Sequence, residues 1–178
     1  NNPKFNNRSL TLKPDLNTIR HMAWLEDKSY LIYSDLIYPL TNLPFEICPR
    51  NQLKKAQAKL EDLGFSVKGA SELEYYFYNK NYAENKKNNY GLNVMDTFGS
   101  HPEDYLIQEG DRFDHIYEQF RMKLKESGMT IETTKGEASP GQHEINVSHD
   151  DSMKMCDLIL VLKKVKIIFI YQYIFYVF

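Results

Sequence analysis

Two glutamates flank a turn in the stretch GEASPGQHEIN, which runs from Gly136 to Asn146. Pro140 and Gly141 predict a tight turn between two antiparallel strands. If the loop has two residues, Glu137 lies directly opposite Glu144, at a separation of about 5 Å. Like charges placed opposite one another destabilise a hairpin unless something compensates them. The pair therefore predicts a site for a divalent cation.

A second acidic pair lies in SELEYYFY, residues 71–78, where aromatic content and alternation predict a strand. Alternation places Glu72, Glu74 and Tyr76 on one face, and the intervening apolar side chains on the other. Taken alone, this pattern is typical of an amphipathic strand with two solvated glutamates. Together with the hairpin, it predicts three or four carboxylates converging on one spot, which suits hard cations such as Mg²⁺ or Mn²⁺.

The histidines do not extend this ligand set. His143 lies between Gln142 and Glu144, so alternation turns it away from the carboxylate face, and we expect a structural or surface role for it rather than metal ligation. The sequence contains no Walker loop, no glycine-rich dinucleotide fingerprint and no nucleophile elbow. Acidic side chains and a metal ion are therefore the chemistry that the motifs indicate.

The segment ELEYYFY, followed by IETTKGEASPGQHEIN, resembles the glutamine synthetase family, which carries an E-x-E strand and a GEx(G/S)PGQxE hairpin in this order. Residues 12–36 are similar to the family's P-D-x-x-T strand, and residues 48–65 to its helix that opens with a Pro-Arg pair. The resemblance runs from about Lys13 to about Lys164. It implies a type I-like glutamine synthetase or γ-glutamyl-amine ligase, which uses ATP to join ammonia or an amine to the γ-carboxylate of glutamate.

The resemblance also implies site residues and cofactors. Glu74, Glu137 and Glu144 match the glutamates that hold a first Mg²⁺ or Mn²⁺ ion, and Glu72 matches one ligand of a second ion that bridges the ATP phosphates. Glu132 matches a glutamate near the nucleotide. The family's remaining histidine, arginine and loop glutamate have no counterpart in this chain. We therefore expect the chain alone to be catalytically inactive, and its full-length form to be a ring-shaped homo-oligomer.

The expected fold is α+β, with an antiparallel sheet and flanking helices. Residues 1–45 are expected to be the C-terminal part of a β-grasp domain, residues 46–166 the first half of the catalytic domain, and residues 167–178 an aberrant apolar tail. Within this frame the sequence predicts elements in chain order: helix 48–63, strand 67–78, loop 79–93, helix 113–127 and helix 151–164.

The tail, residues 167–178, has no period that buries one face and no turn or cap. A transmembrane anchor needs about 20 apolar residues, which the tail does not reach. A core strand is a second interpretation. The favoured third is an artefact of gene prediction, because codons for Val165 and Lys166 can contain an intron donor, and the tail has the residues of AT-rich DNA.

Composition narrows the function classes. The 178 residues carry a net charge of −2 and no basic cluster, so neither nucleic acid nor an anionic membrane surface is indicated as a partner. Cys48 and Cys156 are far apart in sequence, which favours free thiols in a reducing compartment, and the expected location is the cytoplasm. Two alternatives to glutamine synthesis stay open: a ligase for polyamines or other amines, and a non-catalytic structural relative of the family.

Overall fold

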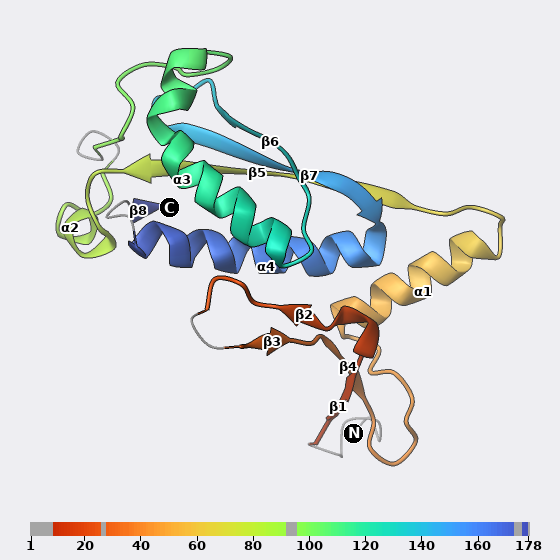
Figure 1. Ribbon diagram of the computed structural model, residues 1–178. Helices are drawn as coiled ribbons and strands as arrows, with labels where there is room; N and C mark the ends of the chain where they lie inside the picture. The colour runs from red at the N-terminus through yellow and green to blue at the C-terminus, as the bar shows by residue number, and fades with distance from the viewer. Residues whose placement is uncertain (1–8, 26–27, 92–95, 173–175, 178) are drawn as a thin grey trace. The chain divides into compact units, whose positions relative to one another are not determined.

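The computed structural model describes residues 9–25, 28–91, 96–172 and 176–177 (Figure 1). The chain forms two compact units: Asn1–Gly69 with Asp150–Asp157, and Ala70–His149 with Leu158–Phe178. Each unit combines helices with antiparallel strand pairs, which confirms the predicted α+β class.

The first unit is built from two small antiparallel pairs and a helix. Strand β1 pairs with β4, and β2 pairs with β3. Asp15 caps a short 3-10 helix after β1 by accepting a hydrogen bond from the backbone of Asn17. Trp24 is buried here with 7% of its surface exposed. In chain order the elements are β1 (Thr11–Pro14), the 3-10 helix (Leu16–Thr18), β2 (Arg20–His21), β3 (Tyr30–Leu31), β4 (Ser34–Ile37) and α1 (Pro49–Glu61).

The second unit contains a sheet with the strand order β6-β7-β5-β8. The pairs β6/β7 and β5/β8 are antiparallel. Two of the elements, β5 and α4, begin in the first unit and continue into the second, and β7 ends in the first. In chain order the elements are β5 (Lys68–Tyr78), α2 (Tyr82–Lys87), α3 (Ile107–Glu126), β6 (Ile131–Gly136), β7 (Gln142–Asp151), α4 (Ser152–Gln172) and β8 (Tyr176–Val177).

Helix α3 covers one face of this sheet (Figure 1). Phe113 stacks on Phe77 of β5 with ring centroids 5.0 Å apart. The buried side chains of α3 recur every three or four residues, which is the pattern of a helix with one face in the core. They include Ile116, Phe120 and Leu124.

The predicted loop 79–93 is wrong in part, because it contains helix α2. The side chain of Asn81 accepts a hydrogen bond from the backbone of Glu84, and the carboxylate of Glu84 accepts one from the backbone of Asn81. This reciprocal capping box satisfies amides that a short helix otherwise leaves unpaired. The N-x-x-E spacing was the local signal for it. Residues 92–95 lie outside the described residues.

Two helices are longer than predicted. Helix α3 begins at Ile107 rather than Phe113, and α4 continues to Gln172 although the predicted helix ends at Lys164. Residues 165–172 contain no proline or glycine, so nothing in the sequence interrupts the local hydrogen bonding of a helix. Tail residues 173–175 and 178 lie outside the described residues. Within the part of the chain that the structure describes, no helix is both long and apolar enough to cross a membrane.

Candidate metal centre

The hairpin β6/β7 has a different register from the predicted one. Lys135 pairs with Glu144, and Gly136 pairs with His143. The backbone N–H of Glu137 donates to the carbonyl of Gln142 at 2.8 Å, so residues 138–141 form the loop. The predicted two-residue loop is wrong, because the Pro-Gly pair lies at the end of the turn rather than at its centre.

This correction moves Glu137 by two residues relative to β7, and a shift of two leaves every side chain on its face. Glu137 is therefore a diagonal neighbour of Glu144 on one face of the sheet instead of its direct partner. Gly141 has φ +73°, a left-handed conformation that favours glycine and allows the chain to enter β7.

The carboxyl groups of Glu137 and Glu144 are hydrogen-bonded to each other. The hydrogen bond between the two carboxyl groups lowers the pKa of Glu137 and raises the pKa of Glu144, and burial raises the latter further. Glu144 has only 6% of its surface exposed. Two carboxylates this close repel one another when both are ionised, and a divalent cation in place of the proton would hold both of them charged. The pair therefore fits a divalent cation in donor type and in charge.

Glu74 joins the same face through a glutamine. The amide nitrogen Nε2 of Gln142 donates to Glu74 Oε2 at 2.6 Å, and the hydroxyl of Tyr76 donates to Gln142 Oε1 at 3.2 Å. On the opposite face of β5, Tyr75 and Phe77 are buried. The predicted alternation of β5 is thus confirmed, and Gln142 connects Glu74 to the hairpin.

The predicted metal ligand Glu72 and the predicted nucleotide residue Glu132 are not gathered with the pair. Glu72 is exposed on β5, and Glu132 is exposed at an irregularity in the pairing between Ile131 and Thr133 of β6. Among the described residues, no three His, Cys, Asp or Glu side chains stand close enough together to hold a metal ion. The structure thus brings two predicted ligands into contact and leaves Glu74 bonded to Gln142.

Lys135 is a member of this face that sequence reasoning missed. Its ammonium Nζ lies 2.7 Å from Glu137 Oε1 and 2.8 Å from Asp104 Oδ1. Hydrogen bonds to Asp104 and Glu137 raise the pKa of Lys135 well above its ordinary value. Its position two residues before Glu137 on the same strand was the available signal, since alternation puts both on one face.

The opposite face of the hairpin is closed by a buried pair. His143 has 1% of its surface exposed, and its Nε2 lies 3.1 Å from Oε2 of Glu103, which is equally buried. Its Nδ1 lies 2.8 Å from the hydroxyl of Tyr117. The prediction that His143 points away from the carboxylates is confirmed. Sequence reasoning missed Glu103, which lies in a segment without periodicity.

Glu103 also holds the backbone of the candidate site. Its N–H donates to the carbonyl of Glu137 at 3.0 Å. Its Cβ lies 2.5 Å from where a Cβ on Gly136 would be, so only glycine lets the two segments approach this closely. Glu137 is therefore fixed at its backbone by Glu103 and at its side chain by Lys135 and Glu144.

The first unit contains a separate charge cluster around Arg50. The guanidinium of Arg50 donates to Asp15 at 2.8 Å, to Asp35 at 2.6 Å and to Asp157 at 3.0 Å. Arg50 has 10% of its side chain exposed. The ammonium of Lys54 also pairs with Asp35, so two cations face three carboxylates. These ion pairs join separate segments of the unit, and we interpret them as a structural cluster rather than a reaction site.

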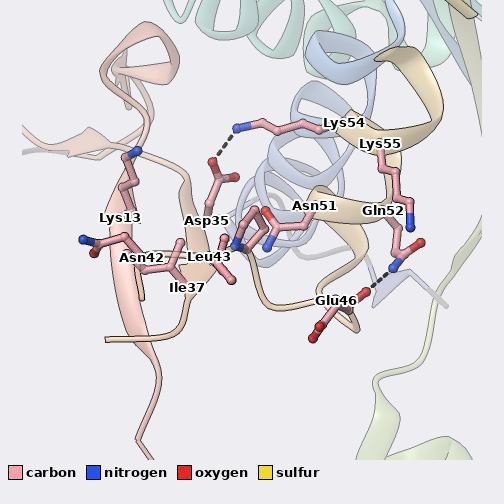
Figure 2. Close-up of a pocket in the computed structure, with 11 residues that line it drawn as sticks. Lys13, Asp35, Ile37, Asn42, Leu43, Glu46, Asn51, Gln52, Lys54 and Lys55 are labelled. Atoms are coloured by element: carbon pink, nitrogen blue, oxygen red, sulfur yellow. Dashed lines mark hydrogen bonds and ion pairs between the residues drawn. The ribbon is translucent and has the colours of Figure 1, made fainter. Parts of the chain in front are cut away.

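A pocket of about 550 Å³ lies beside this cluster in the first unit (Figure 2). Lys54 is paired with Asp35, and the side-chain amide of Gln52 donates to the backbone carbonyl of Glu46. Asn51 donates to the carbonyl of Leu36 at 2.7 Å. These polar side chains are already paired with groups of the same unit, so we assign no ligand to the pocket. Its lining residues are Lys13, Asp35, Ile37, Asn42, Leu43, Pro44, Glu46, Asn51, Gln52, Lys54 and Lys55.

Comparison with known proteins places these motifs in a family. The family model described as glutamine synthetase, catalytic domain, matches residues 46–168. That range contains β5, β6, β7 and all five glutamates singled out from the sequence.

Curated relatives include enzymes with different acceptors in their names. The chain is 30% identical over 149 residues to glutamate–isopropylamine ligase of Pseudomonas sp., with 83% of this chain and 31% of the relative covered. It is 28% identical to gamma-glutamylethanolamide synthetase of Streptomyces coelicolor, with 82% of this chain and 31% of the relative covered. It is 28% identical to glutamine synthetase of Thermotoga maritima, with 82% of this chain and 32% of the relative covered. The chain spans about a third of the length of these relatives.

Among solved structures, the fold is similar to one described as apo GmaS without ligand. The TM-score is 0.76 at 16% sequence identity, over 95% of this chain and 38% of that chain. At this identity, the likeness shows a shared fold.

Proposed function

The chain belongs to the glutamine synthetase family, and from that premise we propose that it is part of an ATP-dependent ligase. The proposed reaction forms an amide between the γ-carboxylate of glutamate and ammonia. The observation that carries the proposal is the carboxyl pair Glu137–Glu144, held on one sheet face inside the stretch that matches the family. Two adjacent carboxylates repel each other when both are ionised, and a bound cation would compensate that repulsion.

We assign the metal ligands by the family pattern. Glu74, Glu137 and Glu144 would hold one Mg²⁺ or Mn²⁺ ion, and Glu72 would contribute to a second. Glu132 would lie near the nucleotide. The hydrogen bond from Gln142 to Glu74 supports the first set, since it holds the third carboxylate beside the hairpin.

The chain's own residues supply positioning. Glu103 fixes the backbone of Glu137 and His143 fixes Glu103 from the buried face, so the carboxylates are presented by a rigid hairpin. When bound, the cations would neutralise negative charge on transferring phosphoryl and carboxylate oxygens. ATP would phosphorylate the γ-carboxylate, and ammonia would then displace phosphate to leave the amide.

An amine is the second candidate for the acceptor. The relatives named for isopropylamine and ethanolamide match this chain as well as the one named glutamine synthetase does. Assaying the full-length protein for phosphate release with glutamate and ATP, first with ammonia and then with isopropylamine or a polyamine, separates these acceptors. A non-catalytic structural relative has less support, because such a protein has no reason to keep Glu137 beside Glu144.

The wider organisation follows the same proposal. Residues 1–45 would be the C-terminal part of a β-grasp domain, residues 46–166 a partial catalytic domain and residues 167–178 an appended tail. The full-length protein would be a ring-shaped homo-oligomer in the cytoplasm. Because the chain covers about a third of its relatives, we expect no ligase activity from the 178 residues alone.

Mn²⁺ binding to the 178-residue chain tests the proposal, measured by calorimetry and by loss of the free-ion EPR signal. We expect the wild-type chain to bind, and Glu137→Ala to weaken binding at least tenfold, since each carboxylate removed takes away a charged oxygen ligand. Glu144→Gln, which keeps the shape of the side chain, is expected to do the same. Glu118→Ala on the exposed side of α3 is the matched control and should bind like wild type.

Circular dichroism establishes that each variant is folded before binding is compared. Equal Mn²⁺ affinities in folded wild type, Glu137→Ala and Glu144→Gln would refute this assignment of the ligands. Failure of the folded wild-type chain to bind Mn²⁺ at millimolar concentration would favour the non-catalytic relative.

A further inference from the structure

Lys135 brings a positive charge, which opposes a cation, to the sheet face that carries Glu137 and Glu144. Its ammonium lies within hydrogen-bond distance of both Glu137 and Asp104. The exposed fractions of the side chains are 27% for Lys135 and 16% for Glu137. Ion pairs on a fully exposed surface contribute little, but this pair is partly shielded from water and is shared with a second carboxylate.

The segment that carries Asp104 is tied to the hairpin at two points. The N–H of Glu103 donates to the carbonyl of Glu137, and the carboxylate of Asp104 accepts from Lys135. The ammonium also lies 4.6 Å from the ring centre of Tyr105, within the range of a cation–π interaction. Lys135 is therefore held by neighbours that remain available to it when its contact with Glu137 is broken.

We infer that Lys135 is a tethered counter-cation of the site, and that it competes with the divalent cation for Glu137. In the cation-free state its ammonium balances the charge of Glu137. When a divalent cation binds, Lys135 withdraws from Glu137 and stays on Asp104. This inference rests on the proposed function, and it assigns to Lys135 and Asp104 the control of metal affinity at that site.

The direction of the effect follows from Coulomb's law. A lone positive charge beside a ligand carboxylate repels an incoming cation and occupies one of its oxygens. Asp104 reduces this penalty, because it offers the ammonium a second partner at nearly the same distance as Glu137. Removal of Lys135 should tighten metal binding, whereas removal of the charge on Asp104 should weaken it, chiefly through Lys135.

The test measures Mn²⁺ affinity by calorimetry on the folded 178-residue chain and four variants. Lys135→Met keeps the aliphatic stem and is expected to bind roughly tenfold more tightly than wild type. Asp104→Asn is expected to bind several-fold more weakly, and that loss should shrink when Lys135→Met is also present. Lys123→Met removes the same charge from the Lys123–Glu126 pair on α3, and its affinity should stay within about twofold of wild type.

The possible results separate the inference about Lys135 from the proposed metal site. If wild type binds Mn²⁺ and Lys135→Met binds equally or more weakly, Lys135 is not a competitor and the inference is overturned while the metal site stands. An equal tightening in Lys123→Met would also overturn it, because the effect would then be one of overall charge. If neither wild type nor Lys135→Met binds, the proposed metal site fails and the inference fails with it.

Discussion

The two faces of the β6/β7 hairpin have different roles in the candidate site: one carries the candidate metal ligands, and the other holds the hairpin in position. On the open face, the carboxyl groups of Glu137 and Glu144 are hydrogen-bonded to each other, and Lys135 pairs with Glu137. On the closed face, His143 and Glu103 form a pair beneath aromatic rings, among them Phe113 at 4.2 Å between centroids. A buried polar pair contributes little net stability but is costly to break. The closed face therefore fixes the position of the hairpin rather than adding much to the stability of the unit.

Replacement of His143 by phenylalanine tests whether the buried pair of His143 and Glu103 holds the hairpin in position. The variant leaves the buried carboxyl group of Glu103 without its imidazole partner, so we expect a loss of about 3–5 kcal/mol in the free energy of unfolding. Adding Glu103→Leu should recover part of this loss, because the buried carboxyl group that lost its imidazole partner is then removed. Urea denaturation followed by circular dichroism measures both variants. If the double variant is less stable than His143→Phe alone, the two side chains do not act as a pair.

Residue-scale prediction from the sequence succeeded where it depended on alternation along one strand. The faces of Glu72, Glu74 and His143 follow from the pleat of a strand, which every residue of that strand obeys. Lys135 follows the same alternation, but its role depends on Asp104, which lies in a segment with no repeating hydrophobic pattern. Partners of that kind are set by tertiary packing and cannot be read from spacing.

The β6/β7 hairpin is the element on which the site depends, and its turn is confined by its neighbours. A Cβ added to Gly141 would lie 3.0 Å from the carbonyl oxygen of Phe77 and 3.1 Å from Cβ of Thr97. The turn is therefore packed against the end of β5 on its inner side. The sequence identified the turn residues correctly but not their place within it, because Pro-Gly is compatible with several loop lengths.

A comparison of two glycines separates backbone strain from packing. Gly64 after α1 and Gly141 in the hairpin both have positive φ, but no atom lies within 4 Å of a Cβ added to Gly64. We expect Gly64→Ala to cost about 1 kcal/mol of stability from φ alone. Gly141→Ala should cost about 1–3 kcal/mol more, because the methyl group also meets the backbone of β5. Thermal and urea unfolding measure both. Equal costs would show that the hairpin turn is not packed as described.

The helices could likewise be predicted from the sequence only where their signals lie within the helix itself. The end of α1 near Gly64 and the core stripe of α3 follow from capping and periodicity, which act within one element. Helix α2 was also locally encoded through Asn81 and Glu84, although the polar composition around it favoured a loop. The continuation of α4 to Gln172 had no positive signal, since the sequence there merely lacks a helix breaker.

At the scale of the whole molecule, the chain divides into two units with different sources of order. The second unit has a sheet covered by an aromatic and aliphatic helix face. The first unit has shorter strands and many exposed apolar side chains, and its segments are joined by Arg50. Because one guanidinium serves three carboxylates, the stability of the first unit depends on charge more than that of the second.

Arg50→Met should therefore destabilise the first unit in a pH-dependent manner. The hydrogen bond from Arg50 lowers the pKa of Asp15. Burial raises the pKa of Asp35, but hydrogen bonds from Lys54 and Arg50 outweigh it and lower the net value. Groups with a depressed folded-state pKa stabilise the folded state above their ordinary pKa, and this stabilisation is lost as the pH falls through the folded value. The difference between wild type and Arg50→Met is expected to be about 3 kcal/mol near neutral pH and to shrink below about pH 4.

Trp24 makes this measurable, because it is the single tryptophan of the chain and lies buried in the first unit. Its fluorescence during urea unfolding at a series of pH values reports on that unit. Arg121→Met, in the second unit, is the control for loss of a surface arginine: its ion pair with Asp114 is exposed, so its removal should cost less than about 1 kcal/mol at any pH and leave the Trp24 transition unchanged. A difference between wild type and Arg50→Met that stays constant from pH 7 to pH 3 would mean that Arg50 stabilises the unit by packing alone. A difference that shrinks below pH 4 would assign the loss to the carboxylates of Asp15 and Asp35.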